Sequence, residues 1–253
     1  MNRRTIVAAN WKMNGDLALV EKMSASLNQV QLDDNVDVVV CPSFPYLSAM
    51  ANKLTHKNIL LGAQNVSEQI SGAFTGEISM TMLKEFSVNY VIVGHSERRN
   101  LYKESSVLIA RKVKTVLNAG LTPILCIGES AEERTAEHTE VVLAAQLQPV
   151  IDEIGIEKFS EIVIAYEPVW AIGTGKTASP EMAQATHHFI RQFLASNNAE
   201  IAHKVPLLYG GSVNAGNCET LFAQTDIDGG LLGGASLKVE EFTQICSTTK
   251  GSI

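Results

Sequence analysis

Runs of apolar, often β-branched residues recur along the whole chain at nearly even intervals. Eight such runs lie at 5–11, 36–42, 58–64, 90–95, 122–128, 161–168, 205–211 and 228–234. Within each run the apolar residues follow one another instead of alternating with polar ones. This pattern is typical of strands that are buried on both faces of a parallel sheet. The sequence therefore predicts eight parallel strands.

The segments between the runs carry helical periodicity. Apolar residues three or four positions apart form two clear stripes, Val20, Met23, Leu27 and Val30 in one and Leu143, Leu147, Val150 and Ile154 in the other. Helix-end signals fit this interpretation, with Ser43 and Ser179 as N-caps and Gly120 beyond a C-terminus. One residue conflicts with it. Pro149 lies inside the predicted helix 139–154, where proline costs about 3 kcal/mol or forces a kink, so we expect that helix to be bent or split.

Eight strand–helix units in 253 residues favour one closed (β/α)8 barrel, a TIM barrel, with 1–253 as a single domain. An open doubly wound sheet is the alternative that the pattern leaves open. The longest apolar runs fall far short of the ~18 residues that span a membrane. The N-terminal apolar stretch is also too short for a signal sequence. We therefore expect no membrane association.

Composition narrows the functional classes. Hydrophobic residues make up 45% of the chain and charged residues 19%, which is ordinary for a globular protein. A net charge of −7 argues against non-specific nucleic-acid binding. The four cysteines lie far apart at Cys41, Cys126, Cys218 and Cys246, without metal-ligand spacing. We expect buried, reduced thiols in a cytoplasmic protein.

Candidate chemistry lies where the predicted strands end, because the active site of such a barrel forms there. The polar or small residues at these positions are Asn10, Lys12, His95, Ser96, Glu97, Glu167, Gly210, Gly211, Ser212, Gly233 and Gly234. Taken singly, Glu167 could be an ion-pair partner, His95 a helix cap and Lys12 a surface residue. Their joint placement on three strand ends indicates a proton-transfer site.

The glycine pairs suggest a phosphate site beside it. Gly210-Gly211 and Gly233-Gly234 each end a strand and open a helix, where backbone N–H groups bind anions. Two tight turns would also explain them. The segment 168–178 is predicted to be a hinged lid, or else a long connecting loop. It is not a nucleotide-binding P-loop, because Trp170 stands where that motif needs glycine.

Other cofactor and metal motifs find no support. No G-x-G-x-x-G opens the first unit, and His187-His188 lacks a partner at helical spacing.

At this point the chain resembles the triosephosphate isomerase family. The similarity is carried by 8–15, 62–79, 91–99, 126–130, 165–178, 209–214 and 233–237, which span essentially the whole sequence. The resemblance implies a TIM barrel, a homodimer, no cofactor and no metal. It also implies an aldose–ketose isomerase that interconverts dihydroxyacetone phosphate and D-glyceraldehyde 3-phosphate in glycolysis, gluconeogenesis and linked pentose-phosphate metabolism. Pro149 and Gly229-Gly230 depart from the family pattern, at supporting positions only.

The resemblance also implies a role for each site residue. Glu167 would be the base, His95 the electrophile, and Asn10 and Lys12 the substrate-binding pair. Ser96 would support the site, Glu97 would support Lys12, and Cys126 would pack beneath Glu167. The phosphate would be bound by Gly173, Ser212, Gly233 and Gly234. Tyr209 and Ser212 would latch the closed lid, and Thr75 would contact the partner's active site.

These roles form a mechanism. A carboxylate is too weak a base for a carbon acid unless the enediolate is stabilised as it forms. Glu167 would move the proton from C1 to C2 while neutral His95 donates to the carbonyl oxygen and Lys12 supplies positive charge. The N-terminus of a predicted helix would disfavour a charged His95. This pairing of carboxylate and neutral imidazole is a well-known property of the family.

Two other functions remain as alternatives. One is another phosphosugar barrel enzyme, such as a Schiff-base aldolase that uses Lys12. The other is a barrel that binds a phosphate ligand without catalysis. Trapping with borohydride would identify the first, and absence of proton exchange at C1 the second.

Segment 65–79 predicts an interface. It is longer than an ordinary loop after a strand and carries Ile70, Phe74 and Ile78 among polar and glycine residues. Exposed apolar sets usually mark contact surfaces. The apolar set predicts a contact surface, and the resemblance implies that this segment docks into a second subunit of a two-fold dimer. The alternative is a loop folded onto its own barrel.

Overall fold

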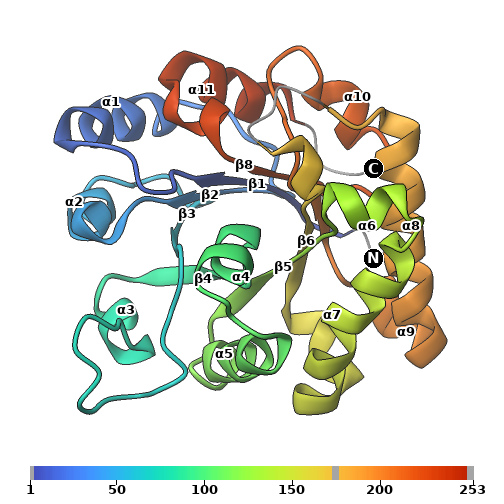
Figure 1. Cartoon of the computed structure of the whole chain (residues 1–253). Helices are drawn as coiled ribbons and strands as arrows, with labels where there is room; N and C mark the ends of the chain where they lie inside the picture. The colour runs from blue at the N-terminus through green and yellow to red at the C-terminus, as the bar shows by residue number, and fades with distance from the viewer. Residues whose placement is uncertain (1–2, 173–176, 250–253) are drawn as a thin grey trace.

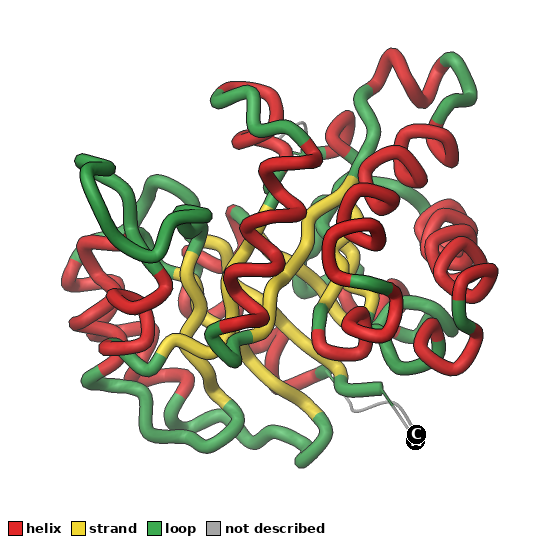
Figure 2. Tube along the Cα trace, turned by 90° about the horizontal axis from the view of Figure 1, so that it is seen from below, coloured by secondary structure: helices red, strands yellow, loops and turns green. Residues whose placement is uncertain are grey.

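Eight parallel strands form a closed barrel, and helices surround it on the outside (Figures 1 and 2). The computed structural model describes residues 3–172 and 177–249. The strands are β1 (Thr5–Asn10), β2 (Val36–Cys41), β3 (Ile59–Ala63), β4 (Val88–Val93), β5 (Thr122–Ile127), β6 (Val163–Tyr166), β7 (Leu207–Tyr209) and β8 (Gly229–Leu232). They follow one another in sequence order around the barrel, and β8 pairs with β1. The predicted TIM barrel is thereby confirmed, and the open sheet is not formed.

Helices alternate with the strands and cover the outer face of the barrel. The α-helices are α1 (Leu17–Leu27), α2 (Leu47–Ala51), α3 (Met80–Glu85), α4 (Ser96–Leu101), α5 (Ser106–Asn118), α6 (Ala131–Thr135), α7 (Thr139–Ile154), α8 (Pro180–Asn197), α9 (Ala199–Ala202), α10 (Cys218–Phe222) and α11 (Val239–Thr248). Short 3-10 helices are η1 (Phe44–Tyr46), η2 (Ile156–Glu161), η3 (Val169–Ala171) and η4 (Gly234–Leu237). The predicted apolar stripes face inward, since Val20, Met23 and Leu27 of α1 are fully buried.

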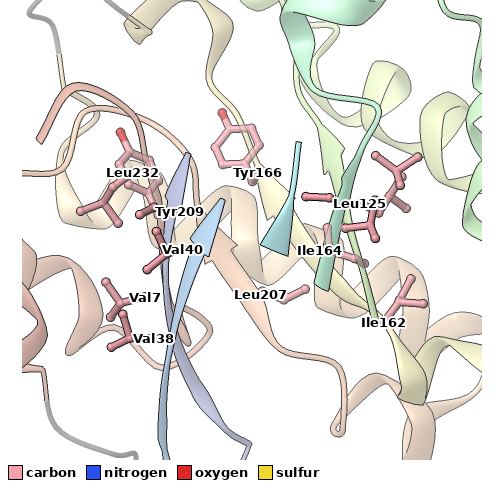
Figure 3. Packing of buried hydrophobic residues seen from close by; sticks show 14 of the residues in the cluster. Val7, Val38, Val40, Leu125, Ile162, Ile164, Tyr166, Leu207, Tyr209 and Leu232 are labelled. Atoms are coloured by element: carbon pink, nitrogen blue, oxygen red, sulfur yellow. The ribbon is translucent and has the colours of Figure 1, made fainter. Parts of the chain in front are cut away.

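The strands are apolar throughout because each one faces two cores. In β1, Ile6 and Ala8 belong to a small cluster inside the barrel, whereas Val7 and Ala9 belong to the large cluster between the barrel and the helices. Figure 3 shows part of the large cluster, including Val7. Successive side chains of a strand point to opposite faces, so a strand between two cores needs apolar residues at every position.

Pro149 does not split its helix. Helix α7 runs without a break from Thr139 to Ile154 with the proline inside it. Proline removes the hydrogen bond to the carbonyl four residues earlier, here that of Ala145. Ala145 is exposed, so water can satisfy this carbonyl, and the helix continues past the missing bond.

The predicted caps give a mixed result. The Ser179 side chain accepts a hydrogen bond from the Met182 N–H at the start of α8, and α5 ends just before Gly120, whose φ of 75° is left-handed. Ser43 precedes η1 as predicted, but its side chain does not cap it. The Ser43 hydroxyl lies close to the carbonyls of Lys12 and Asn14 instead.

The four cysteines are free and buried, as predicted. Over the described ranges, no helix combines the length and the apolar character needed to cross a bilayer.

Candidate active site

A cavity of about 330 Å3 opens at the carboxyl ends of the strands. Nine of the residues predicted from the sequence line it together: Asn10, Lys12, His95, Glu167, Gly210, Gly211, Ser212, Gly233 and Gly234. The predicted phosphate ligand Gly173 lies outside the described residues. The wall also includes Ile172, Val213, Leu231 and Leu237, so polar and apolar residues both line the cavity.

Glu167 follows the end of β6 and is almost completely buried, at 2% exposed. Its Oε2 accepts a hydrogen bond from the Ser96 N–H at 2.8 Å, and its Oε1 lies 2.9 Å from Nε2 of His95. Burial by itself would raise the pKa of Glu167. The His95 ring, the Ser96 N–H and Lys12 together outweigh burial, so this pKa lies below its ordinary value. The surroundings of the carboxylate therefore favour its ionised form.

The backbone around Glu167 leaves little freedom. Its N–H donates to the carbonyl of Ile127 at 2.7 Å, which continues the β5–β6 pairing. A Cβ on Gly128 would stand 1.8 Å from the carbonyl oxygen of Glu167, so only glycine fits there. Cys126 lies buried beside the carboxylate, and burial together with that negative charge raises the pKa of its thiol. Cys126 thus lies next to Glu167, the residue beneath which the resemblance implies that it packs.

His95 is the N-cap residue of α4 and also lines the cavity, so its capping position does not remove it from the site. The backbone N–H of Glu97 donates to its Nδ1 at 3.2 Å. Nδ1 therefore carries no proton, which places the ring proton on Nε2, the atom that faces Glu167.

The electrostatic surroundings of His95 differ from the sequence expectation. Burial lowers the pKa of the ring, but the adjacent carboxylate of Glu167 outweighs it, and the pKa lies above its ordinary value. The helix N-terminus, invoked above as the group that keeps His95 neutral, is therefore opposed by a nearer negative charge in this state.

Lys12 reaches the cavity from an unusual backbone conformation. Its φ is 52°, in the left-handed region that non-glycine residues rarely adopt. The Nζ atom lies 2.7 Å from Oε1 of Glu97, the residue that the resemblance names as its support. The Lys12 N–H donates to Oδ1 of Asn10 at 3.0 Å.

Two residues, Gln64 and Ser43, hold the loop of Lys12 in place, a role that the sequence analysis assigned to neither. The Gln64 side chain donates to the Lys12 carbonyl at 2.8 Å and to the Cys41 carbonyl at 3.0 Å, and the Ser43 hydroxyl lies 2.8 Å from the same Lys12 oxygen. A signal for Gln64 was present, because it is the polar residue directly after β3.

The glycine turns differ in how much room they leave. A Cβ on Gly233 would come within 3.3 Å of Cε of Lys12, and one on Gly211 would overlap the ring of Tyr209. A Cβ on Gly234 would meet nothing within 4 Å. The protein itself therefore requires glycine at 211 and favours it at 233, and a requirement at 234 would have to come from a ligand.

Hydrogen bonds hold both described ends of the predicted lid. At the first end, the Trp170 indole donates to Oε1 of Glu129 at 3.0 Å, and the Ser212 hydroxyl donates to the Ala171 carbonyl at 3.1 Å. At the second end, the Ala178 N–H donates to the Tyr209 hydroxyl oxygen at 3.3 Å. Tyr209 and Ser212 thus contact the segment that they were predicted to latch.

Glu129 is a further residue that the sequence reasoning missed. It is fully buried, and its Oε1 accepts hydrogen bonds from Trp170, from the Tyr166 hydroxyl at 3.0 Å and from Arg134 at 3.0 Å. Its three donors come from β6, the lid and α6, and sequence spacing alone does not bring these together.

The segment after β3 extends away from the barrel beside α3 (Figure 1). Ile70 is 67% exposed and Phe74 46%, and Thr75 is exposed beside them. Ile78 is half-buried against the main core. In the described part of the chain, no group of three or more His, Cys, Asp or Glu side chains could hold a metal ion.

Comparison with known proteins agrees with this geometry. The family model described as "Triosephosphate isomerase" matches residues 5–249. Curated relatives of the same name include those of Colwellia psychrerythraea, 66% identical over 99% of this chain and 100% of the relative, and Pseudoalteromonas translucida, 53% identical over 99% of both. A third, from Alcanivorax borkumensis, is 52% identical over 99% of this chain and 100% of the relative. With the barrel, the clustered site and these full-length similarities together, the chain belongs to the triosephosphate isomerase family.

Proposed function

We propose that this chain interconverts dihydroxyacetone phosphate and D-glyceraldehyde 3-phosphate without a cofactor, as an isomerase of glycolysis and gluconeogenesis. The observation that carries the proposal is one cavity in which a buried carboxylate, an imidazole N–H and an ammonium group meet two glycine turns. Carboxylate, imidazole and ammonium are the groups that a proton shift beside a carbonyl needs. The glycine turns supply the place for the phosphate.

Glu167 acts as the base in this proposal. It takes the proton from C1 of the ketose and returns it at C2, so the two substrates share one enediolate. Its contacts with His95 and the Ser96 N–H must be released for this, because the carboxylate has to reach the substrate carbon. The substrate carbonyl then takes the place of the carboxylate beside Nε2 of His95.

Departure of Glu167 also changes the charge state that His95 favours. The carboxylate is the main group that raises the pKa of the ring. Its movement leaves Glu97 as a weaker raising charge, opposed by burial, the largest influence, and by the helix N-terminus. Both disfavour the charged ring. His95 therefore donates from a neutral Nε2–H to the developing oxyanion, while Lys12, anchored by Glu97, supplies a fixed positive charge.

The phosphate binds in the proposal at the turns formed by Ser212, Gly233 and Gly234. The family resemblance adds Gly173, which lies outside the described residues. Closure of 168–178 excludes water and holds the phosphate so that the enediolate cannot eliminate it. Asn10 and Lys12 complete the substrate-binding set, with Lys12 next to Gly233.

A coupled assay with D-glyceraldehyde 3-phosphate tests this function directly. We expect turnover without added metal or cofactor, and exchange of the C1 proton with solvent deuterium. Covalent inactivation by borohydride in the presence of substrate would instead indicate an aldolase that uses Lys12. Ligand binding without proton exchange would indicate a binding protein.

Assembly, domain and location complete the proposal. We infer a cytoplasmic homodimer of single-domain subunits, 1–253, in which segment 65–79 docks on the partner and Thr75 approaches the partner's Asn10 and Lys12. The exposed apolar side chains of Ile70 and Phe74 support an interface at this segment.

A further inference from the structure

One arginine near the proposed base has no carboxylate partner. Salt bridges with carboxylates are formed by Arg3, Arg4, Arg98, Arg111, Arg134 and Arg191. Among the described residues Arg99 of α4 forms none, although its side chain is half-buried. Withdrawing a charge from water is costly unless other groups satisfy its donors, so the contacts of this guanidinium need a reason.

The Arg99 guanidinium bridges the ends of two neighbouring strands. Its Nε donates to the Gly94 carbonyl at 2.8 Å, and its Nη2 donates to the Cys126 carbonyl at 2.9 Å. The pairing of β4 with β5 ends one residue earlier on each strand, at Val93 and Leu125 (Figure 1). Arg99 therefore continues the connection between the two strands where their backbone pairing stops.

Neighbouring residues fix the position of the guanidinium. Its Nη1 donates at 3.1 Å to the hydroxyl of Ser106, the first residue of α5. Gly94 has a φ of 75°, and a Cβ there would come within 3.1 Å of Nη2 and 3.0 Å of Cγ2 of Ile109. Glycine at 94 thus leaves free the space that the guanidinium occupies.

The two bridged strand ends hold Glu167 from two sides. After β4, Nε2 of His95 lies 2.9 Å from Oε1 of the carboxylate, and the Ser96 N–H donates to Oε2 at 2.8 Å. At the end of β5, the Ile127 carbonyl accepts the Glu167 N–H at 2.7 Å, and Gly128 packs against the Glu167 carbonyl. The separation of the two strand ends therefore sets where the carboxylate stands relative to the imidazole.

Positive charge alone is the alternative explanation for Arg99. Burial lowers the pKa of its guanidinium, while Cys126, Glu167 and Glu104 oppose burial, so the charges of Arg99 and Glu167 do interact. A lysine ammonium would supply the same charge. It would not reproduce the planar fork with which one guanidinium binds two carbonyls, so the two explanations make different predictions for Arg99→Lys.

We propose that Arg99 is a positioning residue for proton transfer: by bridging the Gly94 and Cys126 carbonyls, it fixes the β4 end against the β5 end and so places His95 against Glu167. Arg99 is not among the described residues that line the substrate cavity, so it acts through these two side chains. The inference rests on the proposed function, in which both of them act on the substrate.

Steady-state kinetics of Arg99→Ala and Arg99→Lys test the proposal. Both variants lose the bridge between the carbonyls, and a displacement of ~1 Å at a reacting group costs about 100-fold, so we expect a loss of that size in kcat. KM should change little, because the glycine turns proposed for the phosphate are untouched. Arg111→Ala, on the exposed side of α5, is the matched control and should keep native kcat. Circular dichroism at the assay temperature verifies that each variant is folded.

Chemical rescue separates bridging from charge. Arg99 also lines a second cavity of about 480 Å3, through which a small cation can reach the space left by Arg99→Ala. Guanidinium ion carries the same fork, and we expect it to raise kcat of this variant about tenfold, short of full recovery because a detached ion loses translational freedom on binding. Ammonium ion at the same ionic strength should give no recovery.

Three kinetic results would overturn the proposal. Native kcat in Arg99→Lys, or equal recovery of Arg99→Ala with ammonium ion, would mean that positive charge is sufficient. Native kcat in folded Arg99→Ala would mean that Arg99 serves the fold alone.

A second measurement does not depend on turnover. In protein with isotope-labelled histidine, hydrogen exchange of the proton on Nε2 of His95 reports the contact of this ring with Glu167. We expect exchange about tenfold faster in Arg99→Ala than in the native protein. The ring proton of His187, which is fully buried in α8, is the internal control and should exchange at its native rate.

Unchanged exchange at His95 would contradict the proposal, and equal acceleration at His95 and His187 would assign Arg99 to the stability of the whole fold. Arg99→Lys replaces Arg99→Ala here if the alanine variant does not fold, since it also lacks the fork. If the native protein failed to isomerise triose phosphates, the proposed function would fail, while this exchange would still decide whether Arg99 places His95 against Glu167.

Discussion

The reach of one carboxylate governs the chemistry of this site. Glu167 is held within 2.9 Å of two donors and its backbone is fixed against Gly128. Glu167→Asp withdraws the carboxylate by one methylene, ~1 Å, and a displacement of that size costs about 100-fold in kcat. KM should change little. Steady-state kinetics decide the matter, with Glu219→Asp on the exposed face of α10 as the control, and near-native turnover would remove Glu167 from the role of base.

Gly233 gives a second prediction for a single residue. The valine side chain of Gly233→Val would crowd Lys12 and occupy the place proposed for the phosphate. Turnover of triose phosphate and affinity for inorganic phosphate should fall together, whereas turnover of unphosphorylated glyceraldehyde should fall much less. Gly234→Ala is the matched control, since a Cβ there meets no protein atom within 4 Å. Equal losses on both substrates would assign Gly233 to the fold.

Asp226 predicts how stability depends on pH. Burial would raise its pKa, but Arg191, Gln184 and His188 outweigh burial and hold the pKa below 3.8, its ordinary value. A carboxylate with a depressed pKa stabilises the fold above its ordinary pKa, and this contribution is lost as pH falls through the lowered value. Asp226→Asn should therefore cost about 3 kcal/mol at pH 7 and progressively less below about pH 3.8.

Urea unfolding at pH 7, 5 and 3 measures the difference in the free energy of unfolding between the native protein and Asp226→Asn. We expect this difference to be smaller at pH 3 than at pH 5 and 7. Asp152→Asn, on the surface of α7, serves as the control and should differ little from the native protein at any pH. A constant difference between Asp226→Asn and the native protein across the three pH values would contradict the assignment.

At the scale of elements, α7 lacks one backbone hydrogen bond that a substitution could restore. Pro149 leaves the Ala145 carbonyl without its helical partner, although the helix is continuous. Pro149→Ala restores that hydrogen bond and should stabilise the protein by about 1–3 kcal/mol. Pro180→Ala is the matched control, because proline at the first turn of α8 replaces no helical hydrogen bond. Thermal unfolding of the two variants should show a gain in Tm for the first alone.

Elements are also the scale at which sequence reasoning succeeds best. Burial on both faces makes the strands continuous apolar runs, so all eight could be located, and the barrel then brings Asn10, His95 and Glu167 to one end. Side-chain contacts between elements that are distant in the sequence leave no periodic pattern of apolar residues from which they could be predicted. Glu129 gathers donors from three different elements, and Ser43 turns to the Lys12 loop instead of capping its own helix. Helix α7 can continue past Pro149 because Ala145 is exposed and water can reach its carbonyl. The spacing of apolar residues does not predict this exposure.

At the scale of the whole molecule, the prediction concerns dimer formation through segment 65–79, which follows β3. Deleting Ser71–Thr75 removes Phe74 and Thr75 and should give monomers with greatly reduced turnover, although the proton-transfer residues all remain on one chain. The physical reason is that a partner's loop would no longer support Asn10 and Lys12. Sedimentation at assay concentration measures the assembly. A fully active native species of 27.4 kDa, instead of about twice that mass, would contradict the dimer.

The left-handed backbone of Lys12 has a consequence for how such a protein changes over generations. A non-glycine residue in that conformation costs about 1 kcal/mol of folding free energy relative to glycine. Lys12, which supplies positive charge to the proposed site, therefore makes the fold less stable than glycine would at this position. Selection for heat resistance alone would favour Lys12→Gly, and selection for turnover would oppose it. A library screened only for survival at high temperature should therefore lose catalysis at position 12 while its members remain folded.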